Sequence, residues 1–253
     1  MLRALWSGAT GMAAQQFNID NISNNLANVN TAGFKRQRVQ FQDLFYQNLR
    51  TGRDTLASVG SGVRVAGTQR NFSQGPLERA GDSLSLAIEG EGFFTIEYPN
   101  GEYRYTRNGA FRLDSDGRLV TSDGYPVRIE GGSTIPRGLQ ELTIDRDGTI
   151  TGKLDDSFQE FGQIALTVFA NSSGLEAVGS NLFRDTPQSG EGIQVEPGHE
   201  GAGSILAGYL ETSNVEIVSE MVNLIVAQRA FELNSKSVET ADQMWSIANN
   251  IRR

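Results

Sequence analysis

The sequence predicts an α+β protein in which a helix at each end of the chain flanks a mostly β central domain. Two observations support this prediction. Apolar residues recur every three or four positions over residues 1–30 and again over residues 215–253, which is the helical period. Between these segments the apolar period falls to two, and Asn-Gly and Asp-Gly pairs, which favour tight hairpin turns, interrupt it repeatedly.

The composition excludes several classes of function. The chain of 253 residues carries 22 Lys and Arg against 30 Asp and Glu, a net charge of −8, which argues against nucleic acid or an anionic membrane surface as a partner. It has no Cys, so disulfides and thiolate metal sites are excluded. No apolar stretch is long enough to span a bilayer, and Ser7 and Gly8 interrupt the N-terminal one. We expect no membrane insertion and no cleaved signal peptide.

Residues 1–30 form the first expected helix. Its apolar seam steps by three and four, and Asn28, Asn30 and Gly33 follow the last apolar turn as stop signals. Gly8 and Gly11 each cost a helix about 1 kcal/mol relative to Ala, a penalty that close approach of a second helix would offset. The seam residues expected at subunit interfaces are Leu2, Leu5, Ala9, Met12, Ile19, Ile22, Leu26 and Val29.

Three asparagines, Asn21, Asn25 and Asn28, share one face of this helix. An exposed polar face is the simplest interpretation. The alternative is that the face borders a hydrated channel or fixes the helix register, because a buried Asn discriminates between registers at some cost in stability. Residue patterns alone leave both interpretations open.

Residues 31–70 are expected to form an extended connector with modest order. The connector opens with a basic cluster of Lys35, Arg36 and Arg38, which lacks the aromatic series typical of single-stranded nucleic-acid binding. Two interpretations of the cluster are open. It forms either a solvated face of the connector or ion pairs with acidic groups of an adjacent subunit.

Residues 71–197 are expected to form the β domain, and residues 198–214 a return connector. The run at residues 162–169 is apolar enough for a buried strand. Residues 114–117 and 145–148 resemble pieces of a calcium loop, but Gly stands at position 4 instead of position 6, so hairpin turns are favoured. Residues 90–92, Gly-Glu-Gly, lack the third Gly of a dinucleotide motif and predict a turn entering a strand.

Residues 215–253 form the second expected helix, and Ser213 and Glu216 mark its start with capping-box spacing. A second stripe of small and apolar residues runs beside its main seam, as in helices with several neighbours. Isolated helices are marginally stable in water, so we expect both terminal helices to be buried against other copies of the chain. The seam residues expected there are Ile217, Met221, Leu224, Phe231, Val238, Met244 and Trp245.

The chain offers few residues for catalysis. His199 is its only histidine, so one chain cannot form a multi-His metal site, and we expect it on a loop surface and not in a His-based triad. The Asp155-Asp156 pair suits general acid and base chemistry on glycans, but solvated loop residues are the simpler interpretation. We therefore expect no catalytic, cofactor-binding or metal-ligating residues, and no enzyme activity.

Four segments of the chain stand out together. The first comprises Ser23, Asn24, Asn25, Leu26, Ala27 and Asn28, followed by Gly33, Phe34 and Lys35. The others lie at residues 88–94, at residues 105–109, and at residues 211–215 followed by 228–232. These segments resemble the signatures of the flagellar basal-body rod protein family, over essentially the whole chain. Within that family, residues 234–244 are most similar to the distal rod members.

The resemblance implies an axial protein that polymerises helically with itself into the hollow distal rod and transmits torque to the hook. It implies terminal helices paired as a coiled-coil-like core, with the β domain outside. The implied partners are further copies, other rod and hook proteins at the two ends, the surrounding bushing ring proteins and the flagellar export apparatus. The implied location is the rod of the basal body, which crosses the cell envelope.

Two alternatives stay open. A proximal rod or hook-type axial protein belongs to the same family, and a cell-wall-associated binding or hydrolytic module represents a different class. Compared with family members that form stiff rods, the region corresponding to residues 46–66 is short.

Overall fold

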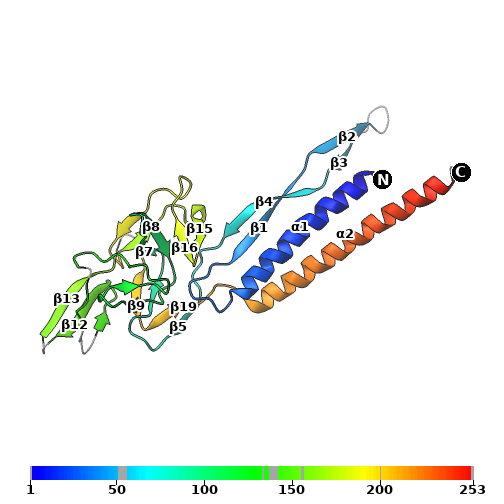
Figure 1. Cartoon of the computed structure of the whole chain (residues 1–253). Coiled ribbons are helices and arrows are strands. Elements are labelled where there is room, and N and C mark those ends of the chain that lie inside the picture. Colours follow the sequence, from blue (N-terminus) through cyan, green and yellow to red (C-terminus); the bar gives the residue numbers. More distant parts are fainter. Residues whose placement is uncertain are drawn as a thin grey trace. The chain divides into compact units, whose positions relative to one another are not determined.

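The computed structural model describes residues 2–50, 56–132, 134–136, 142–154, 157–199 and 201–251. The fold is α+β, with helices α1 (Leu2–Ala27) and α2 (Ile217–Ile251) near the two ends and strands between them (Figure 1). The chain divides into two compact units. The helical unit contains Met1–Ala27, Gln37–Asn71 and Val215–Arg253, and the β unit contains Asn28–Arg36 and Phe72–Asn214. The chain therefore passes between the units four times, after residues 27, 36, 71 and 214.

The two helices of the helical unit run side by side and antiparallel (Figure 1). A Cβ atom on Gly8 would lie 2.7 Å from Val238 Cγ2, and one on Gly11 would lie 2.9 Å from Asn234 Nδ2. Real Cβ atoms do not approach other heavy atoms that closely, so a Cβ at either position would force the side chain of Val238 or Asn234 to move. The close approach expected at the two glycines is thus present within a single chain.

The expected connector differs from the structure, because its two arms pair as an antiparallel hairpin. Strand β1 (Gln37–Asp43) pairs with β4 (Val63–Arg70), and β2 (Tyr46–Arg50) pairs with β3 (Leu56–Gly60). The hairpin packs on α1, where a Cβ on Gly62 would lie 2.3 Å from Thr10 Oγ1. Helix α1 also ends at Ala27, and residues 28–36 belong to the β unit.

The largest sheet of the β unit has six strands, all paired antiparallel. In spatial order they are β15 (Glu176–Gly179), β16 (Leu182–Arg184), β8 (Tyr103–Thr106), β7 (Phe93–Glu97), β14 (Leu166–Val168) and β17 (Ile193–Val195). The apolar run at residues 162–169 supplies β14, and Leu166 is fully buried there, so the buried-strand prediction is confirmed in its second half.

Smaller sheets surround this one, and their turns are those the sequence predicted. Strands β9 (Arg112–Leu113) and β10 (Leu119–Val120) flank Gly117, whose φ is +77°. Strands β11 (Leu142–Ile144) and β12 (Thr149–Leu154) flank Gly148, whose φ is +81°, and β13 (Ser157–Gln163) pairs with β12. A short 3-10 helix spans Ser172–Gly174. Residues 90–92 form the predicted turn into β7.

The return connector expected at residues 198–214 also differs from the structure, because residues 204–207 and 209–211 form two strands of the β unit. Strand β18 (Ser204–Ala207) pairs with β6 (Leu86–Glu89), and β19 (Tyr209–Glu211) pairs with β5 (Leu77–Arg79). Ile205 of β18 is fully buried. The unit is therefore completed by residues that arrive more than 110 positions after β6.

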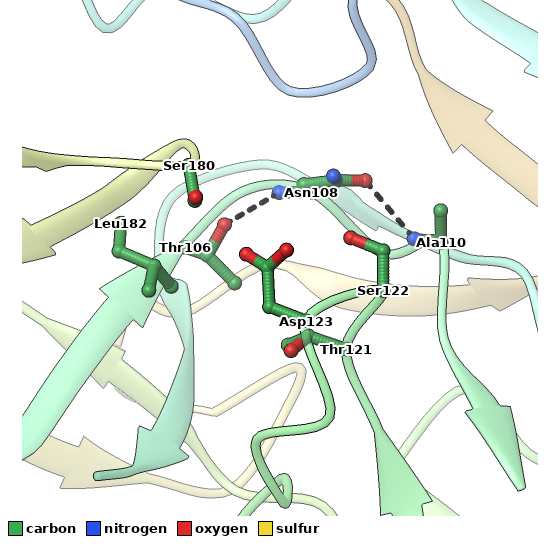
Figure 2. Close-up of a pocket in the computed structure, with 8 residues that line it drawn as sticks. All are labelled: Thr106, Asn108, Ala110, Thr121, Ser122, Asp123, Ser180 and Leu182. Atoms are coloured by element: carbon green, nitrogen blue, oxygen red, sulfur yellow. Dashed lines mark hydrogen bonds between the residues drawn. The ribbon is translucent and has the colours of Figure 1, made fainter.

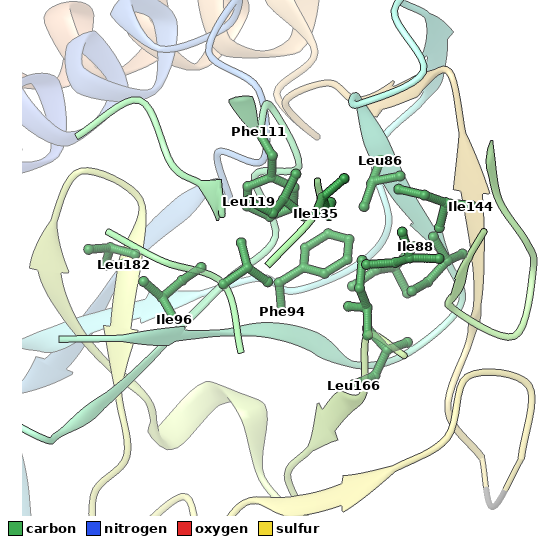
Figure 3. Packing of buried hydrophobic residues seen from close by; sticks show 14 residues of the cluster. Leu86, Ile88, Phe94, Ile96, Phe111, Leu119, Ile135, Ile144, Leu166 and Leu182 are labelled. Carbon is green, nitrogen blue, oxygen red and sulfur yellow. The ribbon is translucent and has the colours of Figure 1, made fainter. Parts of the chain in front are cut away.

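The core of the β unit is a cluster of buried aliphatic and aromatic side chains. Phe94, Ile88 and Leu166 are fully buried in this cluster, and Phe94 meets Phe111 edge to face (Figure 3). A second, aromatic cluster joins Phe93, Tyr105, Phe169, Leu175 and Phe183. The second cluster borders the site described next, because the guanidinium carbon of Arg107 lies 5.6 Å from the centre of the Phe93 ring.

Candidate functional site

The first feature of interest is the signature segment at residues 33–35, which lies in the β unit. Gly33 has a φ of +69°, and a Cβ on it would lie 2.5 Å from the backbone nitrogen of Asn108. Its N–H donates to the carbonyl oxygen of Glu211 at 2.8 Å. Phe34 beside it is buried. Three segments that are distant in sequence therefore meet at Gly33.

The Lys35 side chain is fully buried and forms an ion pair within its own chain. Its Nζ lies 2.5 Å from Glu211 Oε1 and donates to the carbonyl oxygen of Ser73 at 2.8 Å. Glu211 Oε1 also accepts the N–H of Gly75 at 2.8 Å. Both interpretations offered for Lys35, a solvated face and an ion pair with an adjacent subunit, are therefore wrong.

A second buried cation completes the group, which we call the charged cluster: Lys35, Arg107 and Glu211. Arg107 Nη1 lies 3.7 Å from Glu211 Oε2, and Nη2 donates to the carbonyl oxygen of Gly90 at 2.6 Å. All three residues are at most 3% exposed, so two positive charges share one buried negative charge. Each of the four signature segments therefore contributes one residue here, namely Lys35, Gly90, Arg107 and Glu211.

The electrostatics of the cluster are dominated by its burial. Removal from water lowers the pKa of Lys35, and the nearby Glu211 carboxylate opposes this change. Burial lowers the pKa of Arg107 in the same way. Arg107 Nε and Nη1 and Glu211 Oε2 are buried without a hydrogen-bond partner. The cluster is therefore held by charge attraction with incomplete hydrogen bonding.

Asn214 extends the cluster along the chain. Its Oδ1 accepts the N–H of Arg36 at 2.7 Å, and its Nδ2 donates to the carbonyl oxygen and Oγ of Ser73 at 3.0 and 3.1 Å. Residues 33–36, 73–75 and 211–214 are joined in this way. These three segments adjoin three of the four places where the chain passes between the two units, namely those after residues 36, 71 and 214.

A small polar pocket lies beside Asn108 (Figure 2). The Asn108 N–H donates to Thr106 Oγ1 at 3.0 Å, and the Ala110 N–H donates to Asn108 Oδ1 at 3.1 Å. Asp123 and Ser122 lie on the other side of the pocket. The polar groups of Asn108 thus bind within their own turn, which holds the backbone of that turn against Gly33.

In the helical unit, the asparagine face fastens the hairpin to α1. Asn25 is 1% exposed; its Oδ1 accepts the N–H of Gln37 at 2.9 Å, and its Nδ2 donates to the Gln37 carbonyl at 2.8 Å. Asn21 Nδ2 donates to the same carbonyl at 2.8 Å. Asn28 Oδ1 instead accepts from Thr31 Oγ1 at 3.3 Å. An exposed face is therefore wrong for Asn25, which fixes the start of β1.

The second feature is an exposed apolar surface on the first turns of α2. Six large apolar side chains are between 46% and 68% exposed over ten residues. We call this set the apolar α2 face: Ile217, Val218, Met221, Val222, Ile225 and Val226. Large apolar side chains exposed together in this way form a candidate interaction surface.

The expected interface residues divide into exposed and covered ones. Met244 and Trp245 are about half exposed, as are Ile217 and Met221 of the apolar α2 face, while Ile22 is buried. Half-buried ones are Leu5, Met12, Ile19, Leu26, Val29, Leu224, Phe231 and Val238, and Ala9 is exposed; the side chain of Leu2 lies outside the described residues.

Sequence reasoning missed Val218, Val222, Ile225 and Val226, because neither of the two stripes that it followed along the helix passes through these positions. The spacing of Val222, Ile225 and Val226 by three and four was the available signal.

The remaining sequence candidates are His199 and the Asp155-Asp156 pair. His199 is exposed and sits in a turn in which its carbonyl oxygen accepts the Ala202 N–H at 2.9 Å, as expected for a loop residue. Asp155 and Asp156 lie outside the described residues. The described ranges contain no group of three His, Cys, Asp or Glu placed to hold a metal ion. None of the helices described is both long and apolar enough to cross a membrane.

Comparison with known proteins places the whole chain in one family. Residues 5–35 match the family described as flagella basal body rod protein, residues 87–152 the flagellar hook protein FlgE/F/G D1 domain, and residues 206–251 the flagellar basal body rod FlgEFG protein C-terminal family. Over the full length of both chains it is 47% identical to the flagellar basal-body rod protein FlgG of Borreliella burgdorferi and 40% identical to that of Bacillus subtilis. It is 45% identical to the FlgG of Caulobacter vibrioides over 99% of this chain and 100% of the other. The chain belongs to the flagellar basal-body rod protein family.

Proposed function

We propose that this chain is a structural axial protein that polymerises helically with further copies of itself into the hollow distal rod of the flagellar basal body. In that role it transmits torque to the hook and has no enzyme activity. The apolar α2 face is the observation that carries the proposal, because one folded chain leaves it uncovered. The relatives named as rod proteins, similar over their full length, support the same role.

The driving force for assembly is burial of apolar side chains. Covering a half-exposed Val, Ile or Met contributes on the order of 1 kcal/mol. Each subunit would contribute six such side chains. Repeated along a polymer, these contacts add up and transmit torque from one subunit to the next. In the polymer the terminal helices pack as a coiled-coil-like core, and the apolar α2 face lies against helices of neighbouring copies.

The distribution of charge supports a core of helical units. The helical unit holds 10 Lys and Arg and 8 Asp and Glu, a net charge of +2, whereas the β unit holds 12 and 22, a net charge of −10. A strongly charged unit is stabilised by contact with water. We therefore assign the β units to the outside of the rod.

Other flagellar proteins complete the proposed setting. Rod and hook proteins adjoin the two ends of the polymer, and bushing ring proteins surround it. The subunit reaches the rod through the flagellar export apparatus.

The test is polymerisation of the purified chain, followed by electron microscopy of concentrated samples. Ile225→Asp places a charge in the apolar α2 face, where burial of an unpaired charge opposes assembly. Gln243→Asp adds the same charge at another exposed position of α2 and is the matched control. We expect tubular polymers from the unaltered chain and from Gln243→Asp, and monomers from Ile225→Asp. Normal polymers from Ile225→Asp would refute the assignment of this face.

A further inference from the structure

The charged cluster is held differently from the rest of the β unit interior. The hydrophobic core consists of closely packed apolar side chains, with Ile88, Phe94 and Leu166 fully buried. The cluster instead combines two buried cations with one buried anion, and Glu91 is a further acidic neighbour of Arg107. Buried ion pairs give little net stability, because desolvation offsets most of the attraction.

Incomplete hydrogen bonding weakens the cluster further. Arg107 Nε and Nη1 and Glu211 Oε2 lack partners while the cluster is closed. Local opening would admit water to these atoms and to the Lys35 ammonium group, which recovers their hydration. Opening therefore costs less free energy here than in the apolar core.

The hydrogen bonds around the cluster connect its segments to one another. The N–H groups of Gly33, Arg36 and Gly75 donate to Glu211 O, Asn214 Oδ1 and Glu211 Oε1 at 2.8, 2.7 and 2.8 Å. All three acceptors lie within residues 211–214. Displacement of that one segment consequently breaks these three bonds at once, whereas the bond from Lys35 Nζ to the Ser73 carbonyl oxygen joins the other two segments directly.

We propose that the charged cluster is a clasp that opens and closes on its own, so that residues 33–36, 73–75 and 211–214 separate while the hydrophobic core of the β unit stays folded. These three segments adjoin three of the four places where the chain passes between the units. The closed clasp holds the three segments together, and the open clasp releases them. The inference goes beyond the proposed function, because it concerns the single chain and holds whether or not the chain forms a rod.

Amide hydrogen exchange on the intact monomer, followed residue by residue by NMR, tests this proposal. The amides of Gly33, Arg36 and Gly75 report on the clasp. The amides of Val127 and Ile164, which donate to Leu119 O and Gly148 O within the core, report on the whole unit. We expect the clasp amides to open at least about tenfold more often than the core amides. Equal opening of both sets, by global unfolding alone, would overturn the proposal.

Two substitutions distinguish local opening of the clasp from a general loss of stability of the β unit. Glu211→Gln leaves two buried cations without a charged partner, and we expect clasp opening to rise about 100-fold with little change at Val127 and Ile164. Lys35→Met leaves one cation and one anion, so we expect a smaller rise. Glu196→Gln, at an exposed side chain of the same unit, is the control and should change neither set.

The variants also keep the proposal testable if one of them is unstable. If Glu211→Gln does not fold, the unaltered chain and Lys35→Met still show whether clasp and core open separately. Clasp and core amides that accelerate by equal factors in Lys35→Met would contradict the proposal. Failure of the chain to polymerise would refute the proposed function and leave these exchange results unaffected.

Discussion

Gly33 and Asn108 are in direct backbone contact, so close that a Cβ on residue 33 would lie 2.5 Å from the Asn108 nitrogen. Gly33 follows α1 and belongs to the first signature, whereas Asn108 lies 75 residues later, after β8. Two separate features therefore favour glycine at residue 33. One is the lack of space for a Cβ, and the other is a φ of +69°. The signature is therefore a packing requirement of the β unit rather than a catalytic motif.

Gly33→Ala should destabilise the β unit by about 2 kcal/mol or more, because a positive φ and a steric clash add together. Gly101→Ala is the matched control, since Gly101 has a φ of +75° and open space around its Cα. Urea denaturation of both variants measures the difference. Equal losses would show that backbone conformation alone explains the glycine at residue 33.

Gly8→Ala should loosen the helix pair even though Ala favours a helix by about 1 kcal/mol over Gly. The new Cβ would lie 2.7 Å from Val238 Cγ2, and Val238→Ala removes that atom. In the Val238→Ala background, Gly8→Ala should therefore be neutral or stabilising. Thermal melting of the four chains of this double-mutant cycle, followed by circular dichroism, checks the sign of the coupling.

Asn25→Ala should destabilise the helical unit by about 2 kcal/mol, because it leaves the Gln37 N–H without its buried partner, while the Gln37 carbonyl keeps only the bond from Asn21 Nδ2. Both groups bind Asn25 at 2.8 to 2.9 Å. Asn223→Ala, at an exposed position of α2, should cost much less. Hydrogen exchange at the Gln37 amide reports directly on this contact, and unchanged protection in Asn25→Ala would contradict the assigned role.

Lys35 should make the β unit more stable as pH rises toward 10.5, its ordinary pKa. The pKa is lowered in the folded chain, so between the two values the unfolded chain binds more protons, and stability increases with pH. The raised pKa of the buried Tyr105 acts in the opposite direction above pH 10.0.

Lys35→Met should therefore remove a positive slope from the plot of unfolding free energy against pH, and leave the decline caused by Tyr105. Urea denaturation between about pH 8 and pH 11 measures both contributions. The same slope in the two chains would mean that Lys35 titrates alike when folded and unfolded.

Local patterns were sufficient for much of the fold. The helical period predicted α1 and α2, although α1 ends at residue 27 and not at residue 30. The Asp-Gly pairs at residues 116–117 and 147–148 predicted hairpin turns because Gly accepts the positive φ that such turns need. The hairpin at residues 37–70 was missed because Gln, Arg and Asp dominate β1, and Val39 is its one buried residue.

The candidate sites show the same division. Apolar spacing was enough to predict apolar surface on more than one side of α2, where Ile217, Met221 and Trp245 are about half exposed, since apolar period is a local property. Burial of Lys35 had no local signal, because its partners at residues 73 and 211 come from distant parts of the chain. Asn25 was similar, as its partner Gln37 belongs to a hairpin that the sequence did not predict.

The sequence by itself determined the α+β class, the two terminal helices, the turns and the family, because these depend on residues close together in the chain. Only the tertiary structure decided that a lysine in a basic segment is a buried ion-pair partner and that residues 33–35 of the N-terminal signature pack inside the β unit. The physical reason is that burial depends on which distant segments meet, and a charge becomes favourable in an interior only when folding supplies its counter-charge.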